Sequence, residues 1–323
     1  MLLFEVMYDL IIIGGGPAGV AAGVYAARKQ LKTALITKNF GGQSIDSQGI
    51  ENWIGEIKIS GLELAKKLED HVIHYADKFV DIKKNEFVQK IEKHFVDEVA
   101  TDKKEFFFTV QTNKGSYSAK TVLVTSGSAR KKLPAKNADK FEHKGLTYCA
   151  SCDGPFFKDK TVVVVGGGNS ALESVMQLLA YTKKVFLIHR RNEFRADPVT
   201  VEVIKKNQNL EIIYDSEITE VLGEKMVNSI KYKNNKTQAE SQIPIDGIFV
   251  EIGAIPSTDF VNGLVEITAE NHIIIDPWTQ RTTQDGIWAA GDVTNVKYHQ
   301  NNIATGDAVL ALEDIFTYLK SKR

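Results

Sequence analysis

Continuous runs of apolar residues, each followed by glycines and then by a helix-prone segment, occur twice in the chain. The run at 8–13 leads into the glycine-rich stretch 14–19 and an alanine-rich segment, and a second such run opens at residue 161. A continuous apolar run is typical of a strand that is covered on both faces of a parallel sheet. We therefore predict two strand-helix-strand units. Their elements are expected at 8–13, 20–29 and 32–37, and at 161–165, 171–181 and 184–189.

The remaining apolar positions predict further elements around these two units. Leucines and valines at helical spacing after Ser60, a candidate N-cap, predict a helix over 60–77. Further strands are expected at 86–91, 106–112, 115–119, 121–128, 247–253, 273–276 and 286–293, with three short strands within 212–245 and a C-terminal helix over 302–319. The pattern predicts an α/β fold in which the chain leaves a first sheet, builds a second one and then returns.

Length and charge narrow the class of protein. At 323 residues the chain is long for a single hydrophobic core, so about two domains are expected. The 40 basic and 41 acidic residues leave a net charge of -1, which favours neither nucleic acid nor a membrane surface as a partner. No basic region precedes the apolar residues at the N-terminus, so neither a signal peptide nor a spanning helix is expected. The predicted location is therefore the cytoplasm.

The first glycine-rich stretch fits the fingerprint Gly-x-Gly-x-x-Gly. Its residues include Gly14, Gly16, Pro17, Ala18 and Gly19. In such a turn the glycines let the backbone approach a pyrophosphate, which free N–H groups at the helix N-terminus then bind. Thr37 and Lys38 stand at the end of the second strand, where an acidic residue for a ribose is expected. We predict that these residues form a dinucleotide site.

The second unit carries the same turn, with alanine in the third glycine position. The residues concerned are Gly166, Gly168, Asn169, Ser170 and Ala171, and the strand that follows ends in His189, Arg190, Arg191 and, four residues later, Arg195. An acidic residue at that strand end would accept the ribose 2′-hydroxyl of NAD, whereas arginines offer donors to a 2′-phosphate. We therefore predict NADP at this site. The alternative is a solvated basic turn that binds nothing.

The two cysteines of the chain, Cys149 and Cys152, are separated by two residues and lie just ahead of the second dinucleotide unit. The spacing is typical of a redox dithiol, and Asp153 follows where a carboxyl group could move protons to and from a thiolate. Two alternatives remain open. A structural zinc site lacks its third and fourth ligands, and a pair of buried free cysteines would act only as small apolar side chains.

Seven short motifs are similar, in order and spacing, to those of a known family. They lie at 14–19, 41–43, 51–53, 149–154, 166–171, 189–195 and 290–293. Through them the chain resembles the low-molecular-weight bacterial thioredoxin reductases over essentially its whole length, and also the flavoprotein reductase of alkyl-hydroperoxide peroxiredoxins. The resemblance implies two doubly wound, Rossmann-like nucleotide-binding domains, the second inserted in the first. An FAD domain would comprise 1–126 and 248–323, and an NADPH domain carrying the dithiol would comprise 127–247.

The resemblance also implies which further residues contact FAD. These are Gly42, Gln43, Asn52, Val88, Gly127, Gly291, Asp292, His299 and Gln300. The strand that ends in Gly291 and Asp292 would bring an acceptor for the ribityl chain to the first site. Two departures from the family pattern stand out. Residues 124–127 replace the usual Ala-Thr-Gly turn, and His299 stands where an arginine is common.

The function that the resemblance implies is an NADPH-dependent thioredoxin-disulfide reductase that uses Cys149, Cys152 and Asp153 as catalytic residues. By the same analogy Cys152 would face the flavin, Cys149 would exchange with the partner, and the protein would be a homodimer. One alternative is the same chemistry with a glutaredoxin-like or peroxiredoxin-coupled partner. The other is a flavin-bound redox sensor, or a ferredoxin-fed reductase, that does not use NADPH.

Overall fold

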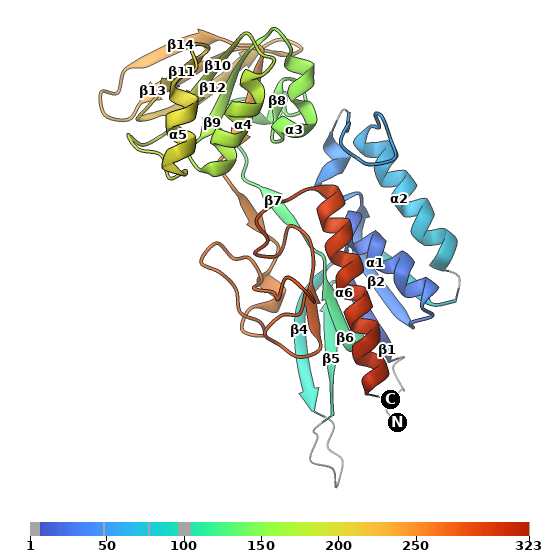
Figure 1. Cartoon of the computed structure of the whole chain (residues 1–323). Helices are drawn as coiled ribbons and strands as arrows, with labels where there is room; N and C mark the ends of the chain where they lie inside the picture. The colour runs from blue at the N-terminus through green and yellow to red at the C-terminus, as the bar shows by residue number, and fades with distance from the viewer. Residues whose placement is uncertain (1–6, 48, 77, 96–104, 323) are drawn as a thin grey trace. The chain divides into compact units, whose positions relative to one another are not determined.

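The structure, a computed structural model, describes residues 7–47, 49–76, 78–95 and 105–322, and its chain forms two compact units. Unit 1 contains Met1–Ile45, Ser60–Ala129 and Ile255–Arg323, and unit 2 contains Asp46–Ile59 and Arg130–Ala254. The chain passes from one to the other at β7 (Ser128–Arg130) and β16 (Ala254–Pro256), which pair with each other (Figure 1). The predicted fold class, α/β with two Rossmann-like units of which the second is inserted in the first, is confirmed.

Unit 1 is built on a sheet in the order β3-β2-β1-β6-β5-β4, with β17 also paired to β6. Its strands are β1 (Tyr8–Gly15), β2 (Thr33–Phe40), β3 (Val80–Lys84), β4 (Val88–Phe95), β5 (Phe106–Thr112), β6 (Ser116–Val124) and β17 (Ile287–Ala289). Neighbours among β3, β2, β1, β6 and β17 are parallel, whereas β4 and β5 are added as antiparallel strands. Leu10, Ile11 and Ile12 are fully buried, as their continuous run predicted.

Four strand predictions in unit 1 were wrong in their extent. The strands expected at 115–119 and 121–128 are the single strand β6, whose first half pairs with β5 and whose second half pairs with β17. Residues 273–276 make only isolated bridges, because Ile273 and Ile275 pair with three different segments. The strand expected at 286–293 is limited to β17, since Gly291 turns the chain with a φ of 76°.

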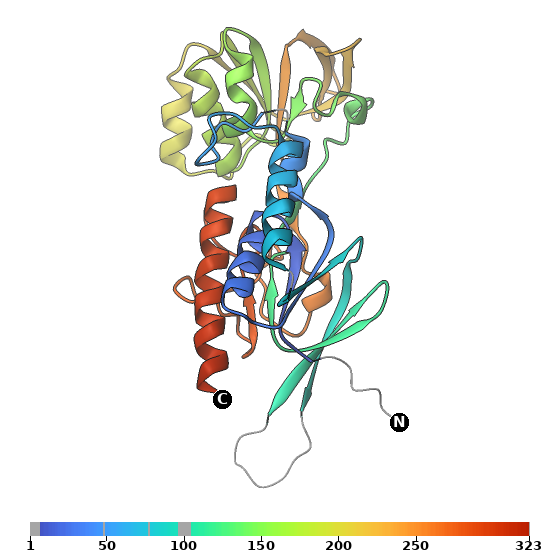
Figure 2. The same ribbon diagram turned by 90° about the vertical axis from the view of Figure 1, so that its right-hand side faces the viewer.

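Three helices pack against the sheet of unit 1. They are α1 (Pro17–Arg28), α2 (Gly61–Ala76) and α6 (Asn301–Ser321), accompanied by the short 3-10 turns η1 (Gly42–Asp46) and η4 (Asp259–Val261). Figures 1 and 2 show the C-terminal helix α6 lying beside α1. Ser60 caps α2 as predicted, because its hydroxyl accepts a bond of 3.2 Å from Glu63 N while the Glu63 carboxylate accepts one of 3.1 Å from Ser60 N. Residue 77, the predicted end of this helix, lies outside the described residues.

Unit 2 combines a parallel sheet in the order β11-β10-β9-β15-β8 with an antiparallel sheet β12-β13-β14. Its strands are β8 (Leu146–Thr147), β9 (Thr161–Gly166), β10 (Lys184–Ile188), β11 (Leu210–Ile213), β12 (Ser216–Gly223), β13 (Val227–Asn234), β14 (Glu240–Pro244) and β15 (Gly247–Glu251). Its helices are α3 (Ala150–Asp153), α4 (Asn169–Leu179) and α5 (Pro198–Lys205), with 3-10 turns η2 (Ala138–Phe141) and η3 (Gly154–Phe157). The three-strand excursion expected within 212–245 is thus present.

The four consecutive valines of β9, at 162–165, are explained by burial of both faces of this strand. Val162 and Val164 pack in a cluster with Leu172 and Val175 of α4. Val163 and Val165 belong to a cluster on the other face, which includes residues of β12 and β13. β15 pairs with β9 on one side and β8 on the other, so residues 248–251 extend the sheet of unit 2. Asp46–Ile59 also groups with unit 2.

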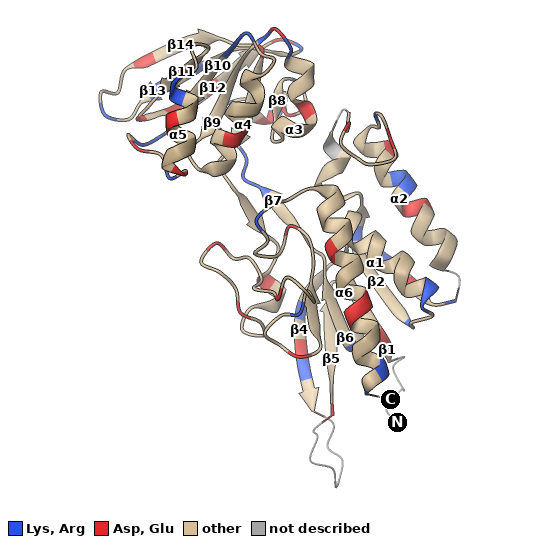
Figure 3. Ribbon diagram, in the orientation of Figure 1, with Lys and Arg blue, Asp and Glu red and all other residues tan. Residues whose placement is uncertain are grey.

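Charged residues of both signs are interspersed in both units, as expected for a net charge near zero (Figure 3). None of the helices in the described part of the chain combines the length and apolarity that crossing a bilayer would require.

Two candidate nucleotide sites and a redox disulfide

A cleft of about 400 Å³ opens in unit 1 where β1, β2 and β6 end. The carboxyl ends of parallel strands are where doubly wound sheets bind ligands. Twelve of the residues predicted for the first nucleotide site line this cleft: Gly14, Gly16, Pro17, Ala18, Thr37, Lys38, Gly42, Gln43, Val88, Gly127, Gly291 and Asp292. The fold therefore brings together segments that lie far apart in the sequence.

The glycine turn after β1 has the close contacts that exclude larger residues. A β-carbon on Gly14, whose φ is 119°, would lie 2.3 Å from the carbonyl oxygen of Thr125. One on Gly19 would lie 1.8 Å from the carbonyl oxygen of Gly14, so Gly19 lets α1 approach β1 and does not itself line the cleft. No side chain caps α1 at Gly16, which leaves the first-turn N–H groups available to an anion. The cleft therefore fits a dinucleotide.

Three other residues predicted for this site, Asn52, His299 and Gln300, are not among those that line the cleft. Asn52 belongs to Asp46–Ile59, which groups with unit 2. His299 and Gln300 precede α6 and do not line the cleft; the His299 Nε2 lies 3.1 Å from the carbonyl oxygen of Val296. Asp307 of α6 was not predicted, although it accepts a hydrogen bond from the Gly291 N–H and burial raises its pKa.

The glycine turn of unit 2 joins β9 to α4. A β-carbon on Gly166 would lie 2.3 Å from the carbonyl oxygen of Glu251, and one on Gly167 would lie 2.2 Å from the imidazole of His189. Gly168 faces open space and no side chain caps α4 there, so Asn169 and Ser170 begin the helix with free first-turn N–H groups. Ala171, in the third glycine position, is fully buried against the sheet. The turn fits a pyrophosphate.

The basic residues predicted for NADP lie beside this turn. Arg195 N donates a hydrogen bond of 2.8 Å to the carbonyl oxygen of Gly167, which fixes the segment after β10 against the glycine turn. Arg190, Arg191 and Arg195 are exposed, whereas His189 is buried and its Nε2 lies 3.0 Å from the carbonyl oxygen of Glu193. Burial lowers the pKa of His189. The arginines are therefore available to bind an anion, while His189 supports the turn.

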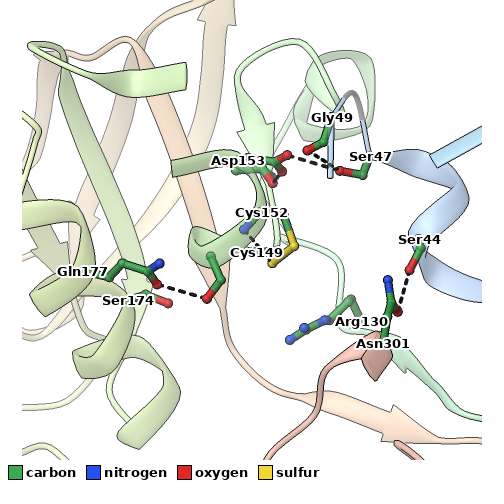
Figure 4. Close-up of a disulfide and its surroundings, with 12 residues drawn as sticks. Ser44, Ser47, Gly49, Arg130, Cys149, Cys152, Asp153, Ser174, Gln177 and Asn301 are labelled. Carbon is green, nitrogen blue, oxygen red and sulfur yellow. Dashed lines mark hydrogen bonds between the residues drawn. A yellow bond between two sulfur atoms is a disulfide. The ribbon is translucent and has the colours of Figure 1, made fainter. Parts of the chain in front are cut away.

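Cys149 and Cys152 form a disulfide in unit 2 (Figure 4). Cys149 caps the one-turn helix α3, and its sulfur accepts a hydrogen bond of 3.2 Å from Cys152 N. Both residues are partly exposed. No three metal-ligating side chains gather anywhere among the described residues. The pair is thus a partly exposed disulfide closed across a single helical turn.

The carboxyl group of Asp153 lies directly after this disulfide. It accepts hydrogen bonds from the hydroxyl of Thr147 and, at 3.4 Å, from that of Ser47 (Figure 4). Burial raises the pKa of Asp153, and the two hydroxyl groups oppose the rise in part. Such a carboxyl group can both hold and release a proton nearer to neutral pH than an exposed aspartate can.

The fold and these sites define a nucleotide-dependent oxidoreductase with a redox disulfide. The chain belongs to the pyridine nucleotide-disulphide oxidoreductase family, whose model matches residues 8–308. Membership implies a flavin and a pyridine nucleotide as cofactors, and the glycine turns of both units fit nucleotides.

Comparison with known proteins confirms the predicted resemblance. The chain is 36% identical over 313 residues to the F subunit of alkyl hydroperoxide reductase from Pseudomonas putida and 33% identical over 312 residues to an NADH dehydrogenase of Bacillus subtilis. Each match covers 97% of this chain but only 58% of the relative. The structure of thioredoxin reductase from Streptococcus pyogenes is similar with a TM-score of 0.85 and 35% identity, covering 98% of this chain and 99% of that one. The enzyme from Giardia duodenalis gives a TM-score of 0.86 at 30% identity, covering 98% and 100%.

Proposed function

We propose that the protein is a flavoprotein disulfide reductase that passes electrons from NADPH, through FAD and the Cys149–Cys152 disulfide, to a thioredoxin-like protein. The observation that carries the proposal is the disulfide itself, which stands in the same unit as the second glycine turn and is followed by a partly buried carboxyl group. A bound flavin would accept electrons from a nicotinamide and deliver them to a disulfide.

The two cofactors are assigned to different units by the residues of each candidate site. FAD is assigned to unit 1, where Asp292 offers a carboxylate acceptor and Lys38 a charged donor along the cleft. NADPH is assigned to unit 2, because Arg190 and Arg191 offer charged donors to a 2′-phosphate at the end of β10.

The chemistry assigned to the reduced dithiol is thiol-disulfide exchange. One cysteine thiolate attacks the partner disulfide, forms a mixed disulfide and expels one partner sulfur as a thiolate. The second cysteine then attacks the mixed disulfide, which reforms Cys149–Cys152 and releases the reduced partner. Asp153 takes the proton from the attacking thiol and returns it to the leaving partner sulfur. By analogy Cys149 is assigned the attack on the partner and Cys152 the contact with the flavin.

A second candidate keeps this chemistry and changes the donor or the partner. It uses NADH, or reduces a peroxiredoxin-type protein instead of a thioredoxin-like one. The names of two relatives, an alkyl hydroperoxide reductase and an NADH dehydrogenase, favour this candidate. The exposed arginines after β10 favour the first.

Anaerobic stopped-flow reduction of the purified yellow protein separates these candidates. Bleaching of the flavin absorbance by NADPH and not by NADH supports the proposal, and the reverse preference supports the second candidate. Absence of bleaching by either nucleotide rejects both and favours a redox sensor or a ferredoxin-fed reductase. Reduction of purified thioredoxin-like and peroxiredoxin-type proteins, measured in parallel as free thiols, then identifies the class of partner.

A further inference from the structure

The carboxyl group of Glu251 lies beside the second glycine turn and has no place in the chemistry described so far. Glu251 is the last residue of β15 and pairs in register with Gly166, the last residue of β9. The chain leaves β9 through α4 to reach β10 on one side, whereas β15 flanks β9 on the other. Glu251 therefore lies at the switch point of the sheet, where doubly wound folds bind dinucleotides.

The residues around this point fix how a dinucleotide would lie across it. Arg190 and Arg191 follow β10, so the adenosine end with its 2′-phosphate belongs on that side. The pyrophosphate belongs at Gly168 and the N-terminus of α4, between the two sides. The nicotinamide half must then extend toward the end of β15, which is where Glu251 lies.

The Glu251 side chain is only 7% exposed and is held from two directions. Its Oε1 accepts a hydrogen bond of 2.8 Å from the hydroxyl of Ser174 on α4, and its Oε2 lies 3.9 Å from a guanidinium nitrogen of Arg130. Glu173 on α4 adds a second negative charge in its neighbourhood. Burial raises the pKa of Glu251 to about 7, and Arg130 and Ser174 oppose the rise in part. The carboxyl group is thus poised between its neutral and charged forms near neutral pH.

We propose that Glu251 faces the nicotinamide half of the bound dinucleotide and distinguishes its oxidised from its reduced form by charge. The inference rests on the proposed function of unit 2 as the nucleotide-binding unit. The oxidised nicotinamide ring carries a positive charge and the reduced ring does not. An ionised Glu251, whose side chain is itself largely removed from water, attracts the oxidised ring and gains nothing from the reduced one. Binding of NADP+ therefore releases a proton from Glu251, and binding of the reduced form does not.

This coupling gives the site a preference that changes with pH. Below pH 7 the carboxyl group is largely neutral, so NADP+ must displace a proton to gain the attraction, whereas the affinity for the reduced form does not change with the state of Glu251. Above pH 7 the carboxylate is already formed, so NADP+ binds without first displacing a proton. If binding of NADP+ lowers the pKa of Glu251 by one, the affinity for NADP+ relative to the reduced dinucleotide changes by about tenfold across the titration.

The test is isothermal titration calorimetry of the flavin-loaded full chain with two ligands. One ligand is NADP+, and the other is 1,4,5,6-tetrahydro-NADP, an analogue whose ring is uncharged and cannot transfer hydride. Titrations in two buffers of different ionisation enthalpy count the protons released at pH 7. Both ligands carry the 2′-phosphate, so its own titration cancels when they are compared. We expect release of about half a proton more with NADP+, and an affinity ratio of NADP+ to analogue that rises several-fold between pH 6 and pH 8.

Two variants locate the effect in one side chain. Glu251→Gln should remove the difference between the ligands while both still bind. Asp246→Asn removes an exposed carboxylate at the other end of β15, one that accepts a bond of 2.9 Å from Thr161 N, and should leave the difference intact. Equal proton release with both ligands in the wild-type protein overturns the inference and leaves the proposed function standing, and this result needs no variant. Failure of both ligands to bind overturns the proposed function and the inference with it.

Discussion

Replacing Glu251 by glutamine should stabilise the protein at alkaline pH and leave its stability unchanged at acidic pH. The folded chain raises the pKa of this carboxyl group from its ordinary value of 4.5 to about 7, chiefly through burial. A group whose pKa is raised on folding contributes stability below its unfolded pKa and loses that contribution as the pH rises through the folded value. The rise corresponds to about 3 kcal/mol of unfolding free energy, which the wild-type protein loses between pH 4.5 and pH 7 and the glutamine variant keeps.

Urea unfolding followed by far-UV circular dichroism, at pH 5, 6, 7 and 8.5, measures this difference. The variant should match the wild type within about 0.5 kcal/mol at pH 5 and exceed it by up to about 3 kcal/mol at pH 8.5, because the neutral amide is not penalised by burial in the way a carboxylate is. Asp246→Asn is the control, and its difference from the wild type should be the same at every pH. A Glu251→Gln difference that does not grow with pH would show that the buried carboxyl group does not titrate in this range.

Three further predictions concern the sites themselves. Replacing Arg190 and Arg191 by alanine should raise the KM for NADPH on the order of 10- to 100-fold, because charge-assisted bonds to the 2′-phosphate are lost, and should leave the KM for NADH unchanged in steady-state assays. Asp153→Asn should lower turnover with a protein disulfide on the order of 100-fold, while the rate of flavin bleaching by NADPH stays the same in stopped-flow; equal losses in both would contradict a role in proton transfer. Gly19→Ala should abolish flavin retention, because its β-carbon would lie 1.8 Å from a backbone oxygen of the first glycine turn. Gly306→Ala is the control, since a β-carbon there faces open space, and this variant should retain a full complement of flavin as measured by absorbance.

The elements that could be predicted from the sequence are those whose position is determined by residues within the element itself. Residues 10–13 and 162–165 are all apolar because β1 and β9 are inner strands of parallel sheets, and each run of apolar residues reflects that burial directly. The start of α2 is encoded in the reciprocal bonds of Ser60 and Glu63. By contrast, β6 changes partners along its length, and β3 was not predicted because only one of its five residues is buried. Where such strands begin and end depends on the neighbouring strands in the sheet, and the local sequence pattern carries no information about those neighbours.

The same distinction holds for the candidate sites. The glycine turns follow from spacing, since only glycine fits where Gly14 and Gly166 meet backbone oxygens of neighbouring segments. Glu251 and Asp307 do not belong to any recognisable sequence motif. Glu251 is held by residues of α4 and β7, and Asp307 lies against the turn at Gly291, so the raised pKa of each follows from its surroundings in the fold. A surface glutamate and a buried one look alike in a sequence, so such groups emerge only when the elements around them are assembled.

The central claim is that electrons taken from NADPH reach the Cys149–Cys152 disulfide. Anaerobic titration of the flavin-loaded protein with NADPH, followed by flavin absorbance and by counting of free thiols, tests it most directly. The wild-type protein should take up about two equivalents of NADPH per flavin and yield two new thiols, and Cys149→Ser with Cys152→Ser should take up about one and yield none. Uptake of one equivalent by both proteins, with the disulfide of the wild type still intact, would contradict the account.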